Sequence, residues 1–146
     1  MKLRPFTPGD ELALADLWFE SWSSIGLEQP VVTRGELIER VPRDLANRWE
    51  VTVAEGSGRL LGFLALAASE QRLDQLFIAP DAQGHGIGGA LFDLAKVRLP
   101  DGFWLATQLA NDRARSFYER QGMTMDRMEP SPSGDRVFYR FDPKPA

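Results

Sequence analysis

The chain has 146 residues, of which 43% are hydrophobic and 26% are charged, and its formal net charge is −4. This length and composition suit a soluble protein with a core of its own, so we expect a single domain over residues 1–146. The acidic balance argues against general nucleic-acid binding, and the absence of cysteine excludes disulfides, thiolate metal sites and a cysteine nucleophile.

No stretch of the sequence has the features of a membrane segment. Residues 1–6 carry charges but lack the apolar centre of a signal peptide, and the longest apolar run, 60–68, is too short to cross a bilayer. We therefore expect a cytoplasmic protein that binds neither membrane nor nucleic acid. The oligomeric state is left open, with a homodimer among the assemblies considered.

The chain begins with a short strand and a helix. Residues 2–6 are expected to form an edge strand, because Pro5 has no N–H to donate to a neighbouring strand. The run 7–10, Thr-Pro-Gly-Asp, is typical of a helix start. The helix that follows has one mainly apolar face, which is either core or a wall of a substrate site: Leu14, Leu17, Trp18, Ser21 and Trp22.

A second helix is expected after a stretch without a clear pattern. Residues 23–32 contain too few periodic apolar positions to predict an element, and Pro30 interrupts them. Residues 33–36 have capping-box spacing, so we predict a helix that runs to Val41 and is stopped by Pro42.

A hairpin comes next. Residues 49–55 and 59–68 are strand-like and are joined by Gly56-Ser57-Gly58. The second run is almost continuously apolar after Arg59, which indicates a central strand with helices on both faces of the sheet.

The rest of the chain alternates strands with helices, and no internal repeat or long linker divides it. The expected elements are a strand over 73–78, a helix from 87 to about 99, a strand over 103–109, a helix capped by Asn111 that stops at Gly122, and strands over 123–128 and 136–142 separated by the turn-rich run 130–135.

The most informative stretch, residues 73–99, combines a strand, a glycine-rich loop and an amphipathic helix. The strand is interrupted at Pro80, and the loop 83–89 leads into apolar positions at helical spacing. The start of a helix leaves backbone N–H groups unpaired and carries partial positive charge, and glycines there let an anion approach the backbone. The stretch is therefore predicted to hold a phosphate group.

The spacing of this loop resembles a known family motif. Gln83, Gly86 and Gly88 form the pattern Gln-x-x-Gly-x-Gly directly after a Leu-Phe-Ile strand, which resembles the acetyl-CoA motif of the GNAT superfamily of N-acetyltransferases. Downstream, Asn111 and the run 116–123, Ser-Phe-Tyr-Glu-Arg-Gln-Gly-Met, look like the superfamily's Asn…Phe-Tyr-Glu-x-x-Gly-Phe segment. Two motifs in the right order, about 25 residues apart, are a stronger signal than either alone.

The resemblance implies a fold and a reaction. The fold class is α/β with a mixed (α+β) sheet: the GNAT fold, a central mixed sheet of about six to seven strands flanked by about four helices. The reaction is direct transfer of an acetyl group from acetyl-CoA to a primary amine of a small molecule or a protein, without a metal. By the same resemblance, Tyr118 is the general acid that gives a proton to the leaving thiolate.

The resemblance also implies which residues hold the cofactor. The backbone of 76–78 pairs with the pantetheine arm as an added strand does. His85 either adds charge toward a phosphate, if it is protonated, or is a solvated loop residue. Asn111 caps its helix or hydrogen-bonds the arm. Arg115 and Arg120 are expected to be solvated helix residues, although Arg115 could reach a phosphate. The full cofactor-binding set is Leu76, Phe77, Ile78, Gln83, Gly84, His85, Gly86, Ile87, Gly88, Gly89 and Asn111.

The general base stays open. An alkyl amine with a pKa of about 10.4 is neutral in only about one molecule per thousand near pH 7, so a base, a water relay or desolvation has to help. Glu70, Asp74 and Glu119 are candidates. Asp74 comes first among them because strand alternation would place it on the face of Leu76 and Ile78. A solvated or salt-bridged Asp74 without a catalytic role is nevertheless the favoured interpretation. The position where some relatives carry a glutamate, on the strand before Asn111, holds alanine here.

Two other interpretations are considered. Residues 84–89 match the Gly-x-Gly-x-x-Gly dinucleotide fingerprint, but five residues separate the loop from its strand and no acidic residue follows at the ribose position, so we disfavour this interpretation. The second is a catalytically silent GNAT-fold module that binds acyl-CoA or has a regulatory role, which need not retain an acid at Tyr118.

Overall fold

The computed structural model describes residues 1–25, 33–132 and 134–143. Seven described strands form one mixed sheet in the order β1-β2-β3-β4-β5-β7-β6, so the predicted fold class is confirmed. The strands are β1 (Lys2–Pro5), β2 (Glu50–Gly56), β3 (Arg59–Ala67), β4 (Arg72–Ile78), β5 (Phe103–Gln108), β6 (Thr124–Glu129) and β7 (Arg136–Phe141). The helices are α1 (Glu11–Ser24), α2 (Arg34–Asn47), α3 (Ile87–Arg98) and α4 (Asp112–Arg120), with short 3-10 turns at 8–10, 68–70 and 80–82.

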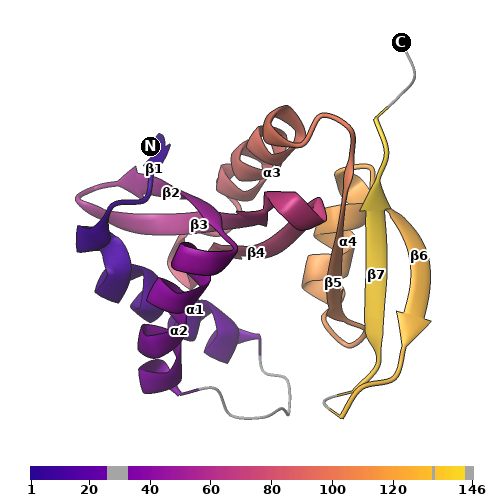
Figure 1. Cartoon of the computed structure of the whole chain (residues 1–146), viewed down its shortest axis with the longest axis horizontal. Helices are drawn as coiled ribbons and strands as arrows, with labels where there is room; N and C mark the ends of the chain where they lie inside the picture. Colours follow the sequence, from indigo (N-terminus) through magenta and orange to yellow (C-terminus); the bar gives the residue numbers. More distant parts are fainter. Residues whose placement is uncertain (26–32, 133, 144–146) are drawn as a thin grey trace.

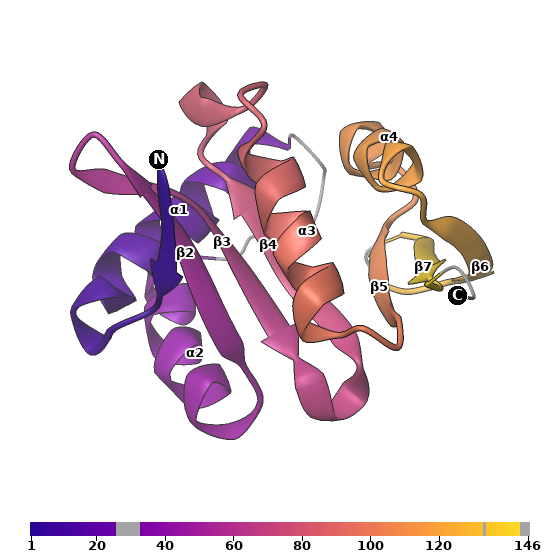
Figure 2. The same cartoon turned by 90° about the horizontal axis from the view of Figure 1, so that it is seen from above.

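The helices cover different parts of the sheet (Figures 1 and 2). The pair α1 and α2 lies on one face of β1–β4, α3 lies on the opposite face, and α4 packs beside β5 and β7. Fully buried side chains from α1, β3 and α3, among them Leu14, Phe63 and Leu91, form the core between these layers. None of the helices in the described ranges is both long and apolar enough to cross a membrane.

The first helix forms as its pattern predicts. Asp10 closes the turn by accepting the backbone N–H of Thr7 (2.9 Å), and α1 begins at the next residue. On its predicted face Leu14, Trp18 and Ser21 are buried, so this face packs against the core. No element is predicted for residues 23–32, and the structure differs at the start of this stretch, where α1 extends to Ser24. Residues 26–32 lie outside the described ranges.

The predicted end of the second helix is wrong, because α2 continues through Pro42 to Asn47. Proline removes one helical hydrogen bond at a cost of about 3 kcal/mol. Packing before the proline and a polar contact after it offset that cost. Val41 is buried, and the backbone carbonyl of Asp44 accepts the N–H of Trp49 at 2.9 Å, which joins the helix end to β2.

The predicted hairpin is confirmed. Ser57 and Gly58 have φ values of 54° and 76°, the left-handed conformation of a two-residue turn that matches the twist of antiparallel strands. The apolar strand β3 lies between β2 and β4 and contacts α1 on one face and α3 on the other, so its continuous apolarity correctly indicated a central position.

Strands β4 and β5 separate soon after they meet. They are the only parallel pair among the described strands, and they pair at one position, Arg72 with Trp104. The backbone N–H of Trp104 donates to the Gln71 carbonyl at 3.1 Å, and beyond this point the strands diverge (Figure 1). One parallel pair is too few for a doubly wound dinucleotide-binding sheet. The divergence also leaves one edge of β4 unpaired.

Candidate active site

A pocket of about 500 Å³ opens where β4 and β5 diverge, between β4, the start of α3 and α4. It brings together all but one of the residues predicted from the two motifs: Leu76, Phe77, Ile78, Gln83, Gly84, Gly86, Ile87, Gly88, Gly89, Asn111 and Tyr118. The lining also includes residues that the motifs did not indicate as binding residues: Ser21, Ile25, Ala82, Arg113, Ala114, Phe117, Arg120 and Gln121.

The entrance of α3 presents free backbone donors to this pocket. Gly86 caps the helix with φ 82°, a left-handed conformation that glycine adopts without strain. The first helical hydrogen bond of α3 runs from the Ala90 N–H to the Gly86 carbonyl (3.1 Å), so the N–H groups of residues 87–89 have no acceptor within the helix. A Cβ on Gly88 would lie 3.2 Å from the Phe117 ring, so glycine there also lets α3 and α4 pack closely.

The edge of β4 that faces the pocket is open. The Ala79 N–H donates to Leu61 on β3 at 2.8 Å, and backbone groups alternate in direction along an antiparallel strand. Those of Leu76 and Ile78 therefore point toward the divergence. The Ile78 carbonyl accepts hydrogen bonds from Ser21 Oγ (3.0 Å) and from the Gln83 side chain (3.2 Å), which fixes the end of this edge.

Tyr118 extends from α4 to the pocket wall. Its side chain is buried and its ring lies 5.4 Å from that of Phe117 and 6.3 Å from that of Tyr139. Among the described residues, no side chain or backbone group hydrogen-bonds its hydroxyl. Burial raises the pKa of Tyr118 above its ordinary value, so the phenol keeps its proton at neutral pH. The site thus contains an uncommitted proton donor.

The arginines of α4 are arranged differently from the expectation. Arg115 points to the sheet, where its Nε donates to the Tyr139 hydroxyl (3.2 Å) and its Nη1 donates to the Leu109 carbonyl (3.3 Å). Arg113 and Arg120 line the pocket instead. Helical spacing explains the outcome, because neither of these two residues lies three or four positions from Arg115 and so neither shares its face.

His85 does not line the pocket. It is exposed, and its Nδ1 lies 3.2 Å from the Ala82 carbonyl oxygen within the loop. Asn111 caps α4, since its Oδ1 accepts the Ala114 N–H at 3.2 Å, and it also lines the pocket. Both functions left open for Asn111 are therefore compatible with its position.

The expected position of Asp74 is wrong, because a β-bulge changes the face it occupies. The β3–β4 register shifts between Ala65 and Leu66, so Asp74 is an extra residue on β4. Its buried carboxylate accepts the Trp49 indole N–H at 2.6 Å, and it lies near α1 and α2. Ile78 lies on the α3 side, with its Cγ1 3.8 Å from the Cβ position of Gly88. Asp74 therefore does not share a face with Ile78.

The other two candidate bases are also bound elsewhere. Glu70 pairs with Arg48 at 3.1 Å, and the Glu119 carboxylate accepts the Tyr139 hydroxyl at 2.6 Å. The pocket lining contains no carboxylate among the described residues. Within those same residues, no cluster of histidine, aspartate and glutamate could hold a metal ion.

Comparison with known proteins agrees with this geometry. The family model of the acetyltransferase (GNAT) domain matches residues 47–123, more than half of the chain. A protein of Mycobacterium tuberculosis, named as a probable N-acetyltransferase, is 28% identical over 123 residues, which cover 75% of this chain and 70% of that protein.

Solved structures share the whole fold. The PaiA N-acetyltransferase of Thermoplasma acidophilum, solved in complex with coenzyme A, has a TM-score of 0.76 at 19% identity, over 97% of this chain and 98% of that one. The ribosomal-protein-S18-alanine N-acetyltransferase of Escherichia coli has a TM-score of 0.75 at 16% identity, over 99% and 95%. With the family match over both motifs, the chain belongs to the GNAT family of N-acetyltransferases.

Proposed function

We propose that this protein, as one domain, transfers an acetyl group from acetyl-CoA directly to a primary amine of a small molecule or a protein. The observation that carries the proposal is that the α3 entrance, the open β4 edge and Tyr118 line one pocket. Each of the three supplies something that thioester aminolysis needs.

The residues present suit a coenzyme A molecule. The N–H groups of residues 87–89 can donate to a diphosphate with the helix dipole behind them. Arg113 and Arg120 add positive charge at the same pocket, in place of basic residues in the loop itself. The backbone groups of Leu76 and the N–H of Ile78 can hydrogen-bond the amides of a pantetheine arm, beside the Ile78 carbonyl that Ser21 and Gln83 already bind. Coenzyme A binding by the Thermoplasma relative supports the same cofactor here.

The chemistry assigned to the residues follows from their positions. Acetyl-CoA supplies an acetyl group activated as a thioester. An amine attacks the thioester carbonyl, the new C–N bond forms, and the C–S bond breaks as Tyr118 donates its proton to the departing thiolate. The amine loses its own proton to water, because no carboxylate lines the pocket among the described residues. Desolvation in the pocket favours the neutral, nucleophilic amine.

The test combines binding with turnover. Acetyl-CoA is titrated calorimetrically, and release of free coenzyme A is then measured with a panel of primary amines, with the amine-free reaction as the hydrolysis background. We expect binding together with amine-dependent release. Binding without release on any amine would favour a silent acyl-CoA-binding module, and absence of binding would refute both functions.

A further inference from the structure

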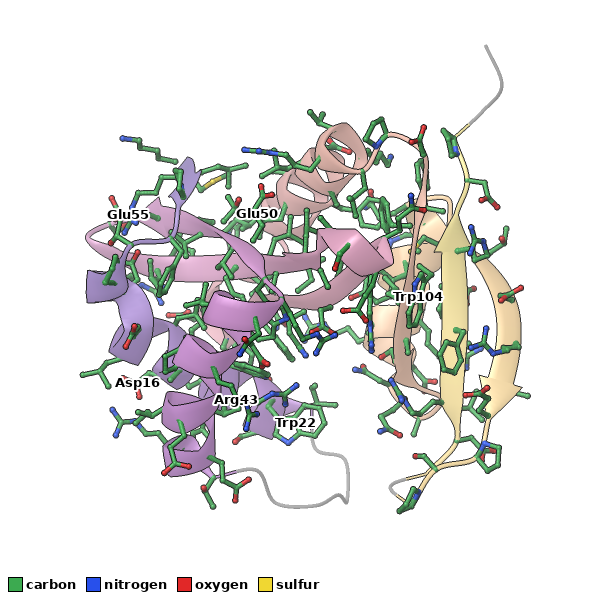
Figure 3. All side chains as sticks on the ribbon, viewed as in Figure 1. Asp16, Trp22, Arg43, Glu50, Glu55 and Trp104 are labelled. Atoms are coloured by element: carbon green, nitrogen blue, oxygen red, sulfur yellow. The ribbon has the colours of Figure 1, made fainter. Side chains whose placement is uncertain are left out.

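The face of β5 and β7 that points away from α4 carries aromatic rings. Leu105 and Tyr139 are register partners on the α4 side, where the Tyr139 ring lies 6.3 Å from that of Tyr118. Because side chains alternate along a strand, Trp104 and Phe138 point to the opposite face, where their rings stack at 5.8 Å. No described helix covers this face (Figures 1 and 2), and Figure 3 labels Trp104 on it.

Three guanidinium groups lie against these rings. One of them, that of Arg127, lies 4.0 Å from the centroid of the Phe138 ring and pairs with Asp126 and Glu129. The Arg72 guanidinium carbon lies 4.5 Å from the centroid of the Trp104 indole, and that of Arg136 lies 5.5 Å from the Phe138 ring. Arg72 and Trp104 also form the one backbone pair between β4 and β5. Arg72 therefore lies at the root of the divergence whose β4 edge is proposed to bind the thioester arm, and Arg136, whose register partner on β5 is Gln108, lies farther along the diverging strands.

The ion pairs near Arg72 leave one positive charge uncompensated. Arg48 pairs with Glu70 at 3.1 Å and with Asp74 at 3.5 Å, and Arg72 Nε lies 3.2 Å from Asp74 Oδ1. With Arg136, three guanidiniums face two carboxylates. The pKa of Arg72 is lowered because burial disfavours its charged form, an effect that Asp74 opposes and that Arg136 and Arg48 reinforce. An added anion would relieve this repulsion.

Donor groups for such an anion are present. The Nε of Arg72 is buried and is not aligned for a hydrogen bond with any acceptor in the described part of the chain, despite its closeness to Asp74. Arg136 makes no ion pair with the described residues, because its register partner Glu129 pairs with Arg127 at 3.2 Å. Guanidinium groups bind carboxylates through paired, charge-assisted hydrogen bonds.

We propose that the amine acceptor carries a carboxylate, which binds between Arg72 and Arg136 beside the Trp104 ring. This inference rests on the proposed function and narrows its acceptor. At about 3.3 Å per residue, Arg72 lies about 13 Å before Leu76 along β4. The long Arg72 side chain spans part of this distance, and the acceptor has to span the rest. The acceptor class is therefore ω-amino acids and short peptides, in which the amine is several bonds from the carboxylate.

The experiment compares acids with their neutral amides. Acetyl transfer from acetyl-CoA is measured with β-alanine, 4-aminobutanoate, 5-aminopentanoate and glycylglycine, each beside its C-terminal amide. We expect kcat/KM for at least one acid to exceed that of its amide by about tenfold or more, the effect of one charge-assisted hydrogen bond. Arg136→Gln should bring this acid-to-amide ratio close to one. Arg72 is left intact because its loss would also disturb the buried Asp74.

The control is Arg98→Gln at the end of α3, away from this face, where Arg98 pairs with Glu50 at 3.1 Å. It should leave the acid-to-amide ratio unchanged. Equal kcat/KM for acids and amides, or a ratio that Arg136→Gln does not lower, overturns the inference and leaves the transferase function standing. Because amides and simple alkylamines are in the same panel, failure of every amine refutes the transferase function itself.

The second measurement does not depend on turnover. N-acetyl-5-aminopentanoate, a product of the proposed reaction, and its amide are titrated into the complex with coenzyme A while the arginine Nε–H resonances are followed by NMR. We expect the acid, and not the amide, to shift the resonances of Arg72 and Arg136. If the acid shifts neither resonance, the inference is overturned. The absence of shifts is the result expected if these aromatic and cationic side chains only stabilise the sheet.

Discussion

Replacing Tyr118 with phenylalanine removes one hydroxyl and almost nothing else. No described residue hydrogen-bonds that hydroxyl, and the ring keeps its contacts with Phe92, Phe117 and Tyr139 at 5.4 to 6.4 Å. The free energy of unfolding should therefore change by less than about 0.5 kcal/mol. A general acid contributes about 100-fold to 10,000-fold, so kcat should fall at least about 100-fold, or about 3 kcal/mol in the activation barrier.

The assay pairs coenzyme A release with calorimetric titration of acetyl-CoA and a thermal melt. Tyr118→Phe should keep the Kd for acetyl-CoA and the Tm while losing rate. Tyr139→Phe is the matched control, because its hydroxyl bridges Arg115 and Glu119 and its loss should lower stability by about 1 to 3 kcal/mol. Unchanged turnover in Tyr118→Phe, or a rate loss fully explained by weaker binding or unfolding, would refute the assignment.

Three further predictions concern stability. Burial raises the pKa of Tyr118 in the folded state, so the neutral phenol's contribution to stability is present below about pH 10 and is lost as pH rises further. Tyr118→Phe should therefore show a shallower fall in Tm at alkaline pH than the parent chain. Equal falls in the Tm of the two proteins would contradict this. The Arg4 guanidinium lowers the pKa of Asp10 to about 2, so the stability that this pair contributes is present above about pH 3.9 and lost toward about pH 2. Urea midpoints of Asp10→Asn should accordingly vary less with pH in that window, and identical acid profiles would count against it. Gly89→Ala should raise Tm because alanine has the higher helix propensity and the new Cβ has no neighbour closer than 4.0 Å. Gly88→Ala should raise Tm less, because its Cβ would lie 3.2 Å from a ring of α4. Equal gains in Tm would show that α3 and α4 are not so closely packed.

Features set by local sequence were predicted well. The glycine loop before α3, the caps at Thr33 and Asn111, and the turn at Ser57-Gly58 each depend on the backbone preferences of a few neighbouring residues. The confirmed family and fold came from such local motifs. Helix α2 shows the limit, because the packing of Val41 and the link from Asp44 to β2 override the local effect of Pro42.

Features set by pairing between distant segments could not be predicted. The face of Asp74 depends on a bulge opposite β3, which no pattern within β4 reveals. The direction of Arg115 depends on a tyrosine on β7, 24 positions later in the chain. The roles of Arg113 and Arg120 at the pocket likewise become visible only when α4 is placed beside α3.

The central claim is that backbone donors of two separate segments hold coenzyme A in one pocket. An amide-resolved NMR titration with coenzyme A tests it most directly, with glycine and leucine resonances assigned. The account predicts saturable shifts in the N–H signals of Gly88 and Gly89 at the α3 entrance and of Leu76 on β4, all at one common Kd. Binding that leaves these three signals in place, or moves only residues outside the pocket, would contradict it.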